Sequence, residues 1–224
     1  MNKSVIDFYN KEENLDYYKK YREEHAPRLD FAVKTFSLDQ IKNEKVGDFG
    51  CGAGFLLEKL DNSNQKYGFD GAYISKTQRL CDFDFYSIDL DLNFANVDTW
   101  SGRNFQNSFD KSFCFETLEH LAAPYNALST MKWMTKENGD IYISIPDQRV
   151  THNVVYPSLM FPHTNFEEFL EQMALPIQEH VVFEGGWPAQ IWKVKNAPWS
   201  EKKLKYPKPE GKFRGCTPLE ATNL

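Results

Sequence analysis

Three glycines alternate along the stretch VGDFGCGAGF, residues 46–55, and an acidic residue, Asp48, precedes the first of them. Glycine tolerates positive φ angles and has no Cβ atom to hold a ligand away from the backbone. A strand is predicted before this loop and a helix after it, so the loop would lie at the carboxyl edge of a parallel sheet, where open α/β folds bind ligands. The stretch therefore predicts an α/β fold with a small-molecule site at Gly50, Gly52 and Gly54.

The spacing of the glycines separates this loop from two phosphate-binding loops. The dinucleotide pattern GxGxxG, started at Gly50, requires a glycine at position 55, where the chain has Phe55. A Walker loop requires a GK[ST] ending, which this stretch lacks. Asp48 would repel a pyrophosphate, whereas it would attract a ligand that carries an ammonium group. The loop therefore favours such a ligand over a nicotinamide dinucleotide.

Short apolar runs separated by helix-length segments follow the loop, a pattern typical of βα units and a parallel sheet. Five strands of this kind are predicted near 45–49, 66–70, 84–88, 109–115 and 139–145. Two further strand-like runs, 179–185 and 189–196, flank a turn with Gly186 and Pro188 and predict an antiparallel pair. The fold class expected is therefore α/β, with a seven-stranded, mostly parallel sheet and a C-terminal antiparallel hairpin.

Helices are predicted from apolar residues at helical spacing. One is expected over 55–60 and another over 124–135, where Leu128, Met131 and Met134 would form the buried face. A third helix is expected to begin with a capping box made by Asn165 and Glu168. Its buried stripe would consist of Phe166, Phe169, Leu170 and Met173.

Composition divides the chain into three parts. Its 224 residues and 41% hydrophobic content suffice for one well-buried core but are short for two full domains. We expect a helical lead-in or lid over 1–44, the ligand-binding α/β domain over 45–196, and a basic, proline-rich tail over 197–224.

Charge and hydropathy disfavour several kinds of partner. The formal charge of −6 argues against a general nucleic-acid-binding role. No apolar run approaches the roughly 20 residues needed to cross a bilayer, and the charged N-terminus is not typical of a secretory signal. The cysteines are scattered without a CxxC pair, as expected for reduced thiols: Cys51, Cys81, Cys114 and Cys216. We therefore expect a cytoplasmic protein without a membrane partner, and no pattern specifies an oligomeric state.

Acidic residues end the second and third predicted strands. Asp70 comes twenty residues after the first loop glycine and is followed by Gly71. An acid in this place typically accepts hydrogen bonds from ribose hydroxyls. In the run SIDLDL, Asp89 is expected to accept a hydrogen bond from an adenine amine, with Leu90 beside the ring and Asp91 as the competing acid. These positions predict an adenosine-containing ligand.

The acid-x-Gly-x-Gly-x-Gly loop is accompanied by two further runs, NSFDKSFCFETLEHL over 107–121 and ENGDIYISIPD over 137–147. Together with the strand-end acids, this set resembles the class I S-adenosylmethionine-dependent methyltransferases over roughly residues 45–196. The resemblance implies a Rossmann-like three-layer sandwich, S-adenosylmethionine as cofactor and S-adenosylhomocysteine as product. The chain departs from the family between Asp70 and Asp89, where a long helix hardly fits and an abbreviated crossover is expected.

The resemblance also assigns residues to the cofactor. The residues expected to bind it are Asp48, Gly50, Cys51, Gly52, Gly54, Asp70, Gly71, Asp89, Leu90 and Glu116. The sulfonium methyl group is already activated, so the enzyme would mainly align an acceptor and exclude water. A general base matters for a hydroxyl acceptor, and the catalytic candidates are Glu116, His120 and His163, with Glu119 and His152 also at the carboxyl edge.

The acceptor is expected to be a small molecule, methylated on oxygen or nitrogen. A sugar or sugar nucleotide is the class that the resemblance suggests. Recognition is assigned to the insert over 148–163 and to Tyr17, Tyr18, Tyr21 and Arg22 of the lead-in, although packing within a lid is the competing interpretation.

Two alternatives remain at this point. Glu116, Glu119, His120 and His163 supply oxygen and nitrogen ligands suited to Mg²⁺, an arrangement similar to that of metal-dependent small-RNA and quinone O-methyltransferases. The preferred interpretation of this motif is structural, with Glu119 and His120 capping a helix or bonding the backbone. The second alternative is a non-catalytic protein that binds S-adenosylmethionine.

Overall fold

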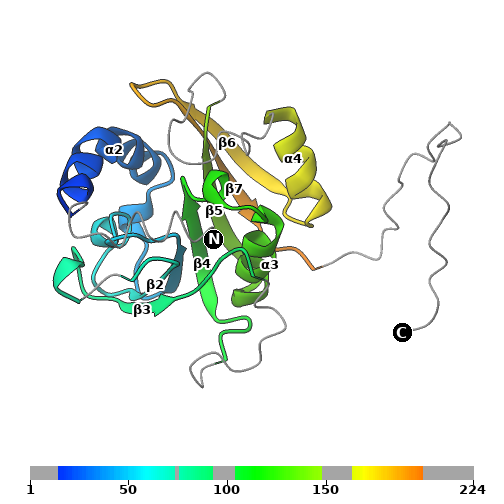
Figure 1. The fold of residues 1–224 in the computed structure, drawn as a ribbon. Coiled ribbons are helices and arrows are strands. Elements are labelled where there is room, and N and C mark those ends of the chain that lie inside the picture. The colour runs from blue at the N-terminus through cyan, green and yellow to red at the C-terminus, as the bar shows by residue number, and fades with distance from the viewer. Residues whose placement is uncertain (1–14, 74–75, 93–103, 148–162, 199–224) are drawn as a thin grey trace, which may run out of the picture.

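In this computed structural model, the described residues are 15–73, 76–92, 104–147 and 163–198 (Figure 1). The side chains of 15–22 and 163–165 are not among them. The α-helices are α2 (Leu15–Thr35), α3 (Pro124–Met134) and α4 (His163–Gln172). Short 3₁₀ helices lie between them: η2 (Leu38–Gln40), η3 (Leu57–Lys59), η4 (Lys76–Gln78) and η6 (Leu118–His120).

The strands form one seven-stranded sheet in the order β3-β2-β1-β4-β5-β7-β6. Their bounds are β1 (Lys45–Phe49), β2 (Gln65–Asp70), β3 (Asp84–Ser87), β4 (Phe109–Phe115), β5 (Thr135–Pro146), β6 (Ile177–Phe183) and β7 (Ala189–Lys195). The first five strands pair in parallel, whereas β7 pairs antiparallel with both β5 and β6. The predicted α/β class with a C-terminal antiparallel hairpin is confirmed.

Helices cover both faces of the sheet, so the fold has three layers: α2 lies on one side and α3 and α4 lie on the other (Figure 1). Successive side chains of a strand point to opposite faces. Accordingly, Phe113 of β4 packs in the cluster beneath α2, whereas its neighbour Cys114 packs beneath α3 and α4. In β5, Tyr142 and Ile143 divide in the same way.

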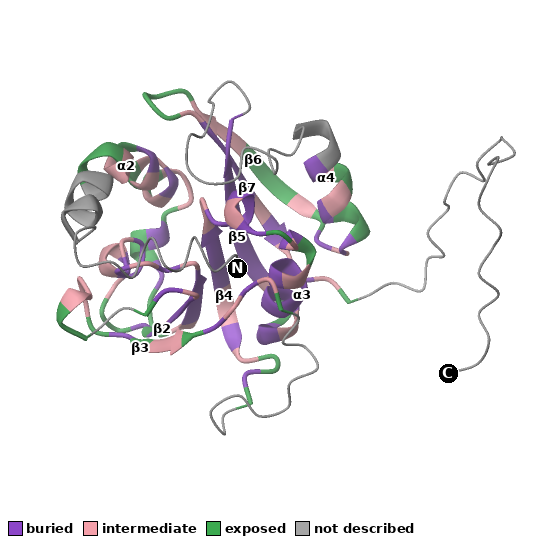
Figure 2. Ribbon diagram, viewed as in Figure 1, coloured by how far each residue is buried: buried purple, intermediate pink, exposed green. Residues whose placement is uncertain are grey.

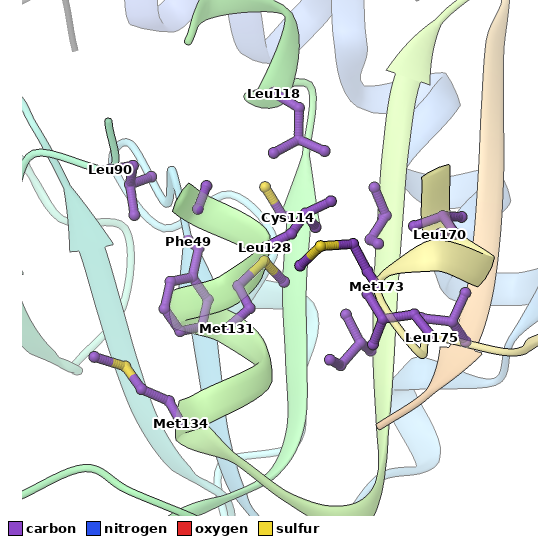
Figure 3. Close-up of a cluster of buried hydrophobic side chains, with 14 of the residues drawn as sticks. Phe49, Leu90, Cys114, Leu118, Leu128, Met131, Met134, Leu170, Met173 and Leu175 are labelled. Atoms are coloured by element: carbon purple, nitrogen blue, oxygen red, sulfur yellow. The ribbon is translucent and has the colours of Figure 1, made fainter. Parts of the chain in front are cut away.

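The larger core cluster lies between the sheet and the pair α3 and α4 (Figure 3). The predicted apolar faces of both helices are confirmed, since their aliphatic and methionine residues are buried: Leu128, Met131, Met134, Leu170 and Met173. Two aromatic residues, Phe49 and Phe69, stack beneath α3 with ring centroids 4.8 Å apart. Burial decreases toward the edge strand β6, as Figure 2 shows.

Two predicted helices differ from the structure. The segment 55–60 forms a run of turns with only the three-residue η3, and the backbone is already extended at Leu60. The helix predicted to begin at Asn165 begins two residues earlier, at His163, so Asn165 lies inside it. The abbreviated crossover after Asp70 is confirmed, since η4 is the only helix among the described residues of that connection.

Helix α2 lies across the edge of the sheet between the glycine loop and the hairpin. Near its C-terminal half, Asp30 pairs with Lys59 beside η3. Its neighbour Phe31 contacts the ring of Phe183 at the end of β6, with centroids 5.5 Å apart. The lead-in helix is therefore attached at both ends of the carboxyl edge.

Several sequence predictions fall outside the described residues. They concern most of the insert 148–163 with His152, the tail from 199 with Cys216, and the side chains of Tyr17, Tyr18, Tyr21, Arg22 and His163. Among the helices that the structure describes, none has the length and apolar character to cross a membrane.

Candidate functional site

The glycine loop after β1 has the backbone conformation that its sequence predicts. All three glycines have positive φ angles, 84° at Gly50, 49° at Gly52 and 89° at Gly54. These angles lie in a region that residues with a Cβ atom rarely adopt. The amides of Gly50 and Cys51 both donate to the carbonyl oxygen of Phe69, at 2.7 and 3.2 Å. The loop is therefore held against the end of β2.

Neighbouring protein atoms require two of these glycines. A Cβ atom on Gly50 would lie 2.0 Å from Oγ1 of Thr117, the residue directly before η6. A Cβ atom on Gly54 would lie 2.6 Å from Cε1 of Phe83. The glycines were expected to make room for a ligand. At Gly50 and Gly54, the close contacts within the protein already explain why a side chain cannot be present. The contact with Thr117 also places the segment after β4 directly beside the loop.

Asp70 organises the loop from the end of β2. One carboxylate oxygen accepts a hydrogen bond from the Gly52 amide at 2.9 Å, and the other accepts one from the Ala72 amide at 2.8 Å. Burial raises the pKa of Asp70, and hydrogen bonds from backbone amides, that of Gly71 among them, oppose the increase. The sequence assigned Asp70 to ribose hydroxyls, and its hydrogen bonds to the loop were not anticipated.

Asp48 lies on β1 just before the loop and is only 4% exposed. Burial, and after it the negative charge of Asp70, raise the pKa of Asp48 to about 8. A positive charge nearby would stabilise the ionised form of such a carboxyl group. The environment of Asp48 therefore suits a cationic ligand, the kind that the sequence predicts.

The third strand ends in acids with different surroundings. Asp91 is tied to the start of α3, because its carboxylate accepts a hydrogen bond from the Ala123 amide at 2.8 Å. Asp89 is half-buried, and its Oδ1 accepts the Asp91 amide at 3.0 Å. Leu90 has no exposed surface and belongs to the core cluster, so it offers no face to an adenine ring in this conformation. Asp89 thus remains the better placed of the two acids.

Cys51 is 4% exposed, and its Sγ lies 3.4 Å from the carbonyl oxygen of Gly52. Burial raises the pKa of this thiol well above its ordinary value. The thiol is therefore a packing group, and Cys51 can contribute to a ligand site only through its backbone.

Glu116 follows β4 and is held by two other elements. Its Oε2 lies 2.8 Å from Nη1 of Arg28 in α2, and its Oε1 accepts a hydrogen bond from the Ser144 hydroxyl at 2.7 Å. Its backbone has a φ of 51°, a strained value for a residue with a side chain. The sequence pattern singled out neither Arg28 nor Ser144. Both side chains of the ion pair are nearly enclosed, with 8% and 7% exposure.

Glu119 lies one turn further on, in η6, and is 4% exposed. Neither carboxyl oxygen has a hydrogen-bond partner on another residue, and the nearest cationic candidate, Nε2 of His120, is 3.8 Å away. Burial and the charge of Glu116 raise the pKa of Glu119 well above its ordinary range. Of the two structural roles expected for Glu119, capping a helix is not found for its side chain, whereas a hydrogen bond from its own backbone amide lowers its pKa in part.

The predicted catalytic and metal-binding residues come together only in part. Glu116, Glu119 and His120 share one short segment, and His163 begins α4 with a side chain outside the described set. Over the described ranges, no group of three or more His, Cys, Asp and Glu side chains could hold a metal ion. Instead of a metal ligand, Glu116 acts as the partner of Arg28.

Comparisons with known proteins agree with this geometry. The family described as "Methyltransferase domain" matches residues 18–187, most of the chain. No curated protein matches the chain in sequence.

Solved structures share the fold at low sequence identity. A magnesium protoporphyrin IX methyltransferase from Synechocystis PCC 6803 with bound SAM is 16% identical, covers 85% of this chain and 94% of its own, and has a TM-score of 0.62. An N-methyltransferase from Bradyrhizobium japonicum in complex with S-adenosyl-L-homocysteine is 17% identical, with 79% and 87% coverage and a TM-score of 0.54. A SAM-dependent methyltransferase from Aquifex aeolicus is 15% identical, with 88% and 100% coverage and a TM-score of 0.53.

Proposed function

The chain belongs to the class I S-adenosylmethionine-dependent methyltransferase family, and from that premise we propose that it methylates an oxygen or nitrogen of a small-molecule acceptor, such as a sugar or sugar nucleotide. The observation that supports a small acceptor is the enclosure of the carboxyl edge. Arg28, Glu116 and Glu119 are nearly buried beside the glycine loop, and α2 lies over them. A largely buried edge with several carboxyl groups fits a small molecule better than a polyanionic nucleic acid.

The residues of the loop fit the cofactor. Asp48 supplies a buried carboxyl group that a cation would stabilise in its ionised form, and Gly52 leaves the backbone bare between the other two glycines. Asp70 and Asp89 stand at the ends of neighbouring strands as acceptors for hydroxyl and amine groups. S-adenosylmethionine, when bound, supplies a methyl group on a sulfonium ion that is already activated for transfer.

The remaining residues act on the acceptor side. Arg28 keeps Glu116 in place from α2, and Ser144 holds the same carboxylate from β5. The side chains of Arg28, Glu116 and Ser144 are therefore linked to one another near Thr117, which lies against the glycine loop. The enclosed edge also limits the access of water, a condition that favours transfer between two bound molecules over side reactions.

The proposed function is tested by binding and then by transfer. The protein is expected to bind S-adenosylhomocysteine in a calorimetric titration, and then to transfer labelled methyl groups to a sugar or sugar nucleotide from a panel that includes RNA and quinols. Labelling of RNA or quinol alone, lost with chelator and restored by Mg²⁺, would favour the metal-assisted alternative. Tight binding of S-adenosylhomocysteine without transfer to any acceptor in a broad cell extract would indicate a non-catalytic binding protein.

Replacing Asp70 with alanine is expected to weaken S-adenosylhomocysteine binding by roughly 1.5–3 kcal/mol, the range for hydrogen bonds to a charged group. The variant would also leave the Gly52 and Ala72 amides without their acceptor, so the free energy of unfolding of the ligand-free protein should decrease too. Calorimetry and thermal unfolding measure the two effects. The control is Asp39→Ala, at an exposed position in η2. An affinity equal to that of the control would reassign Asp70.

A further inference from the structure

Glu119 takes no part in the contacts of Glu116 with Arg28 and Ser144. It lies in η6, two residues after Thr117, whose side chain packs against the Gly50 position of the loop. It therefore occupies the same edge of the sheet as the glycine loop. Its side chain is only 4% exposed, so the carboxyl group is enclosed by the protein at this edge.

The side chain of Glu119 is buried without hydrogen-bond partners on other residues. Both of its oxygens lack such a partner, and Nε2 of His120, at 3.8 Å, is beyond hydrogen-bond distance. Native proteins rarely bury polar groups in this state, and those that remain often belong to a site that is completed by a ligand, an ion or water. Two enclosed acceptor atoms without donors are therefore evidence for a missing donor group.

Arg28, the buried cation that the described residues place at this edge, already has other partners. Nη1 of Arg28 lies 2.8 Å from Glu116, and Nη2 of Arg28 lies 2.8 Å from Nδ1 of His25. Ser144 donates its hydroxyl to the other oxygen of Glu116. The charge of Glu116 is thus compensated. The carboxyl oxygens of Glu119 lack a hydrogen-bond donor on any other described residue, and Arg28 offsets the effect of burial on this carboxyl group only in part.

We propose that Glu119 binds an amino group of the methyl acceptor, so that the acceptor subsite is built for an amine; this inference rests on the proposed methyltransferase function and specifies its substrate class. An ammonium group carries several N–H donors and a positive charge, so it satisfies both oxygens and compensates the charge at once. A hydroxyl group supplies a single donor and no charge. An anionic group would be repelled by an ionised Glu119. Within the acceptor class proposed above, the chemistry points to an amino sugar.

The smallest probe of this subsite is methylammonium, which can enter an enclosed site. In protein saturated with S-adenosylhomocysteine, methylammonium chloride is expected to cause a saturable change in the ¹³C resonance of the Glu119 carboxyl group. Tetramethylammonium chloride, which has the charge but no N–H donor, and methanol, which has one donor but no charge, are expected to leave this resonance unchanged at equal concentration.

The variant Glu119→Gln keeps the shape of the side chain and removes its capacity for negative charge, and it also assigns the resonance. It is expected to bind methylammonium about tenfold more weakly or worse, the loss of one hydrogen bond to a charged group. Its affinity for S-adenosylhomocysteine should stay unchanged. Glu171→Gln, at an exposed position in α4, is the matched control and should behave as the wild type.

Several outcomes would overturn the proposal. They are the absence of a saturable response to methylammonium, an equal response to methanol or tetramethylammonium, a response to magnesium chloride instead, and unchanged methylammonium affinity in Glu119→Gln. If Glu119→Gln fails to fold, the responses of the wild-type protein to methylammonium, tetramethylammonium and methanol still test the amine subsite. Failure of S-adenosylhomocysteine to bind would contradict the methyltransferase function itself, whereas its binding without any amine response would contradict only the amine subsite.

Discussion

Replacing Gly50 with alanine is expected to disrupt the glycine loop and to abolish measurable S-adenosylhomocysteine binding. The φ of 84° costs an L-residue about 1–2 kcal/mol. The added Cβ atom would also lie 2.0 Å from Oγ1 of Thr117, an overlap that forces the loop or the segment after β4 to move, at about 1–3 kcal/mol. The free energy of unfolding should therefore decrease by about 2–5 kcal/mol in urea titrations.

Two further variants separate the causes of this effect. Gly186→Ala is the matched control, because a Cβ atom there would meet nothing within 4 Å, and it should have wild-type stability and binding. Combining Gly50→Ala with Thr117→Gly removes the steric overlap and leaves the backbone strain, so part of the stability should return. Wild-type affinity for S-adenosylhomocysteine in Gly50→Ala alone would show that the loop does not form the cofactor site.

Asp48→Asn is expected to stabilise the ligand-free protein at alkaline pH and to weaken cofactor binding. Burial and Asp70 raise the pKa of Asp48 from its ordinary value of 3.8 to about 8 in the folded state, so folding favours the protonated form. The contribution of Asp48 to stability is therefore fully present below about pH 4 and is lost as the pH rises through 8. This difference corresponds to at most about 6 kcal/mol. Asparagine cannot ionise, so the variant loses this pH dependence.

Melting temperatures of the ligand-free wild type and of Asp48→Asn, measured from pH 5 to 9, provide the test. The two curves should diverge as the pH rises, with the variant the more stable at pH 9. At neutral pH, S-adenosylhomocysteine should bind the variant about tenfold more weakly, because the carboxylate that its ammonium group favours is missing. Asp39→Asn should give the pH curve of the wild type. Parallel curves for Asp48→Asn and the wild type would show that Asp48 is ionised at neutral pH in the ligand-free protein.

The strands of the sheet could be predicted because the sequence patterns that specify them lie within each strand and its adjoining turns. Alternating and apolar runs identified all seven strands, and the turn with Gly186 and Pro188 indicated the antiparallel hairpin that the structure confirms. The three loop glycines likewise have the positive φ angles for which glycine was expected. Helix lengths were less accurate. Apolar spacing over 55–60 predicts a helix, but only the three-residue η3 forms there, and the backbone is extended from Leu60.

The environment of the carboxyl groups was not predictable in this way. The motif ETLEH contains Glu116 and Glu119 three positions apart, and the pattern treats the two as equivalent candidates. In the fold, Arg28 of α2 and Ser144 of β5 both contact Glu116, whereas Glu119 has no hydrogen-bond donor on another described residue. Asp70 differs from its prediction for a similar reason, since its bonds to the loop depend on how the loop folds back over β2.

The residue order of this chain alone therefore establishes the strands, the cofactor loop and the family, because periodicity and backbone restrictions act between near neighbours. Packing between distant segments determines the different surroundings of the three acids. Glu116 pairs with Arg28, Glu119 is buried without a hydrogen-bond donor on another described residue, and Asp70 holds the glycine loop. Desolvation and ion pairing depend on distances across the folded molecule, and these distances arise only when α2 lies over the edge of the sheet.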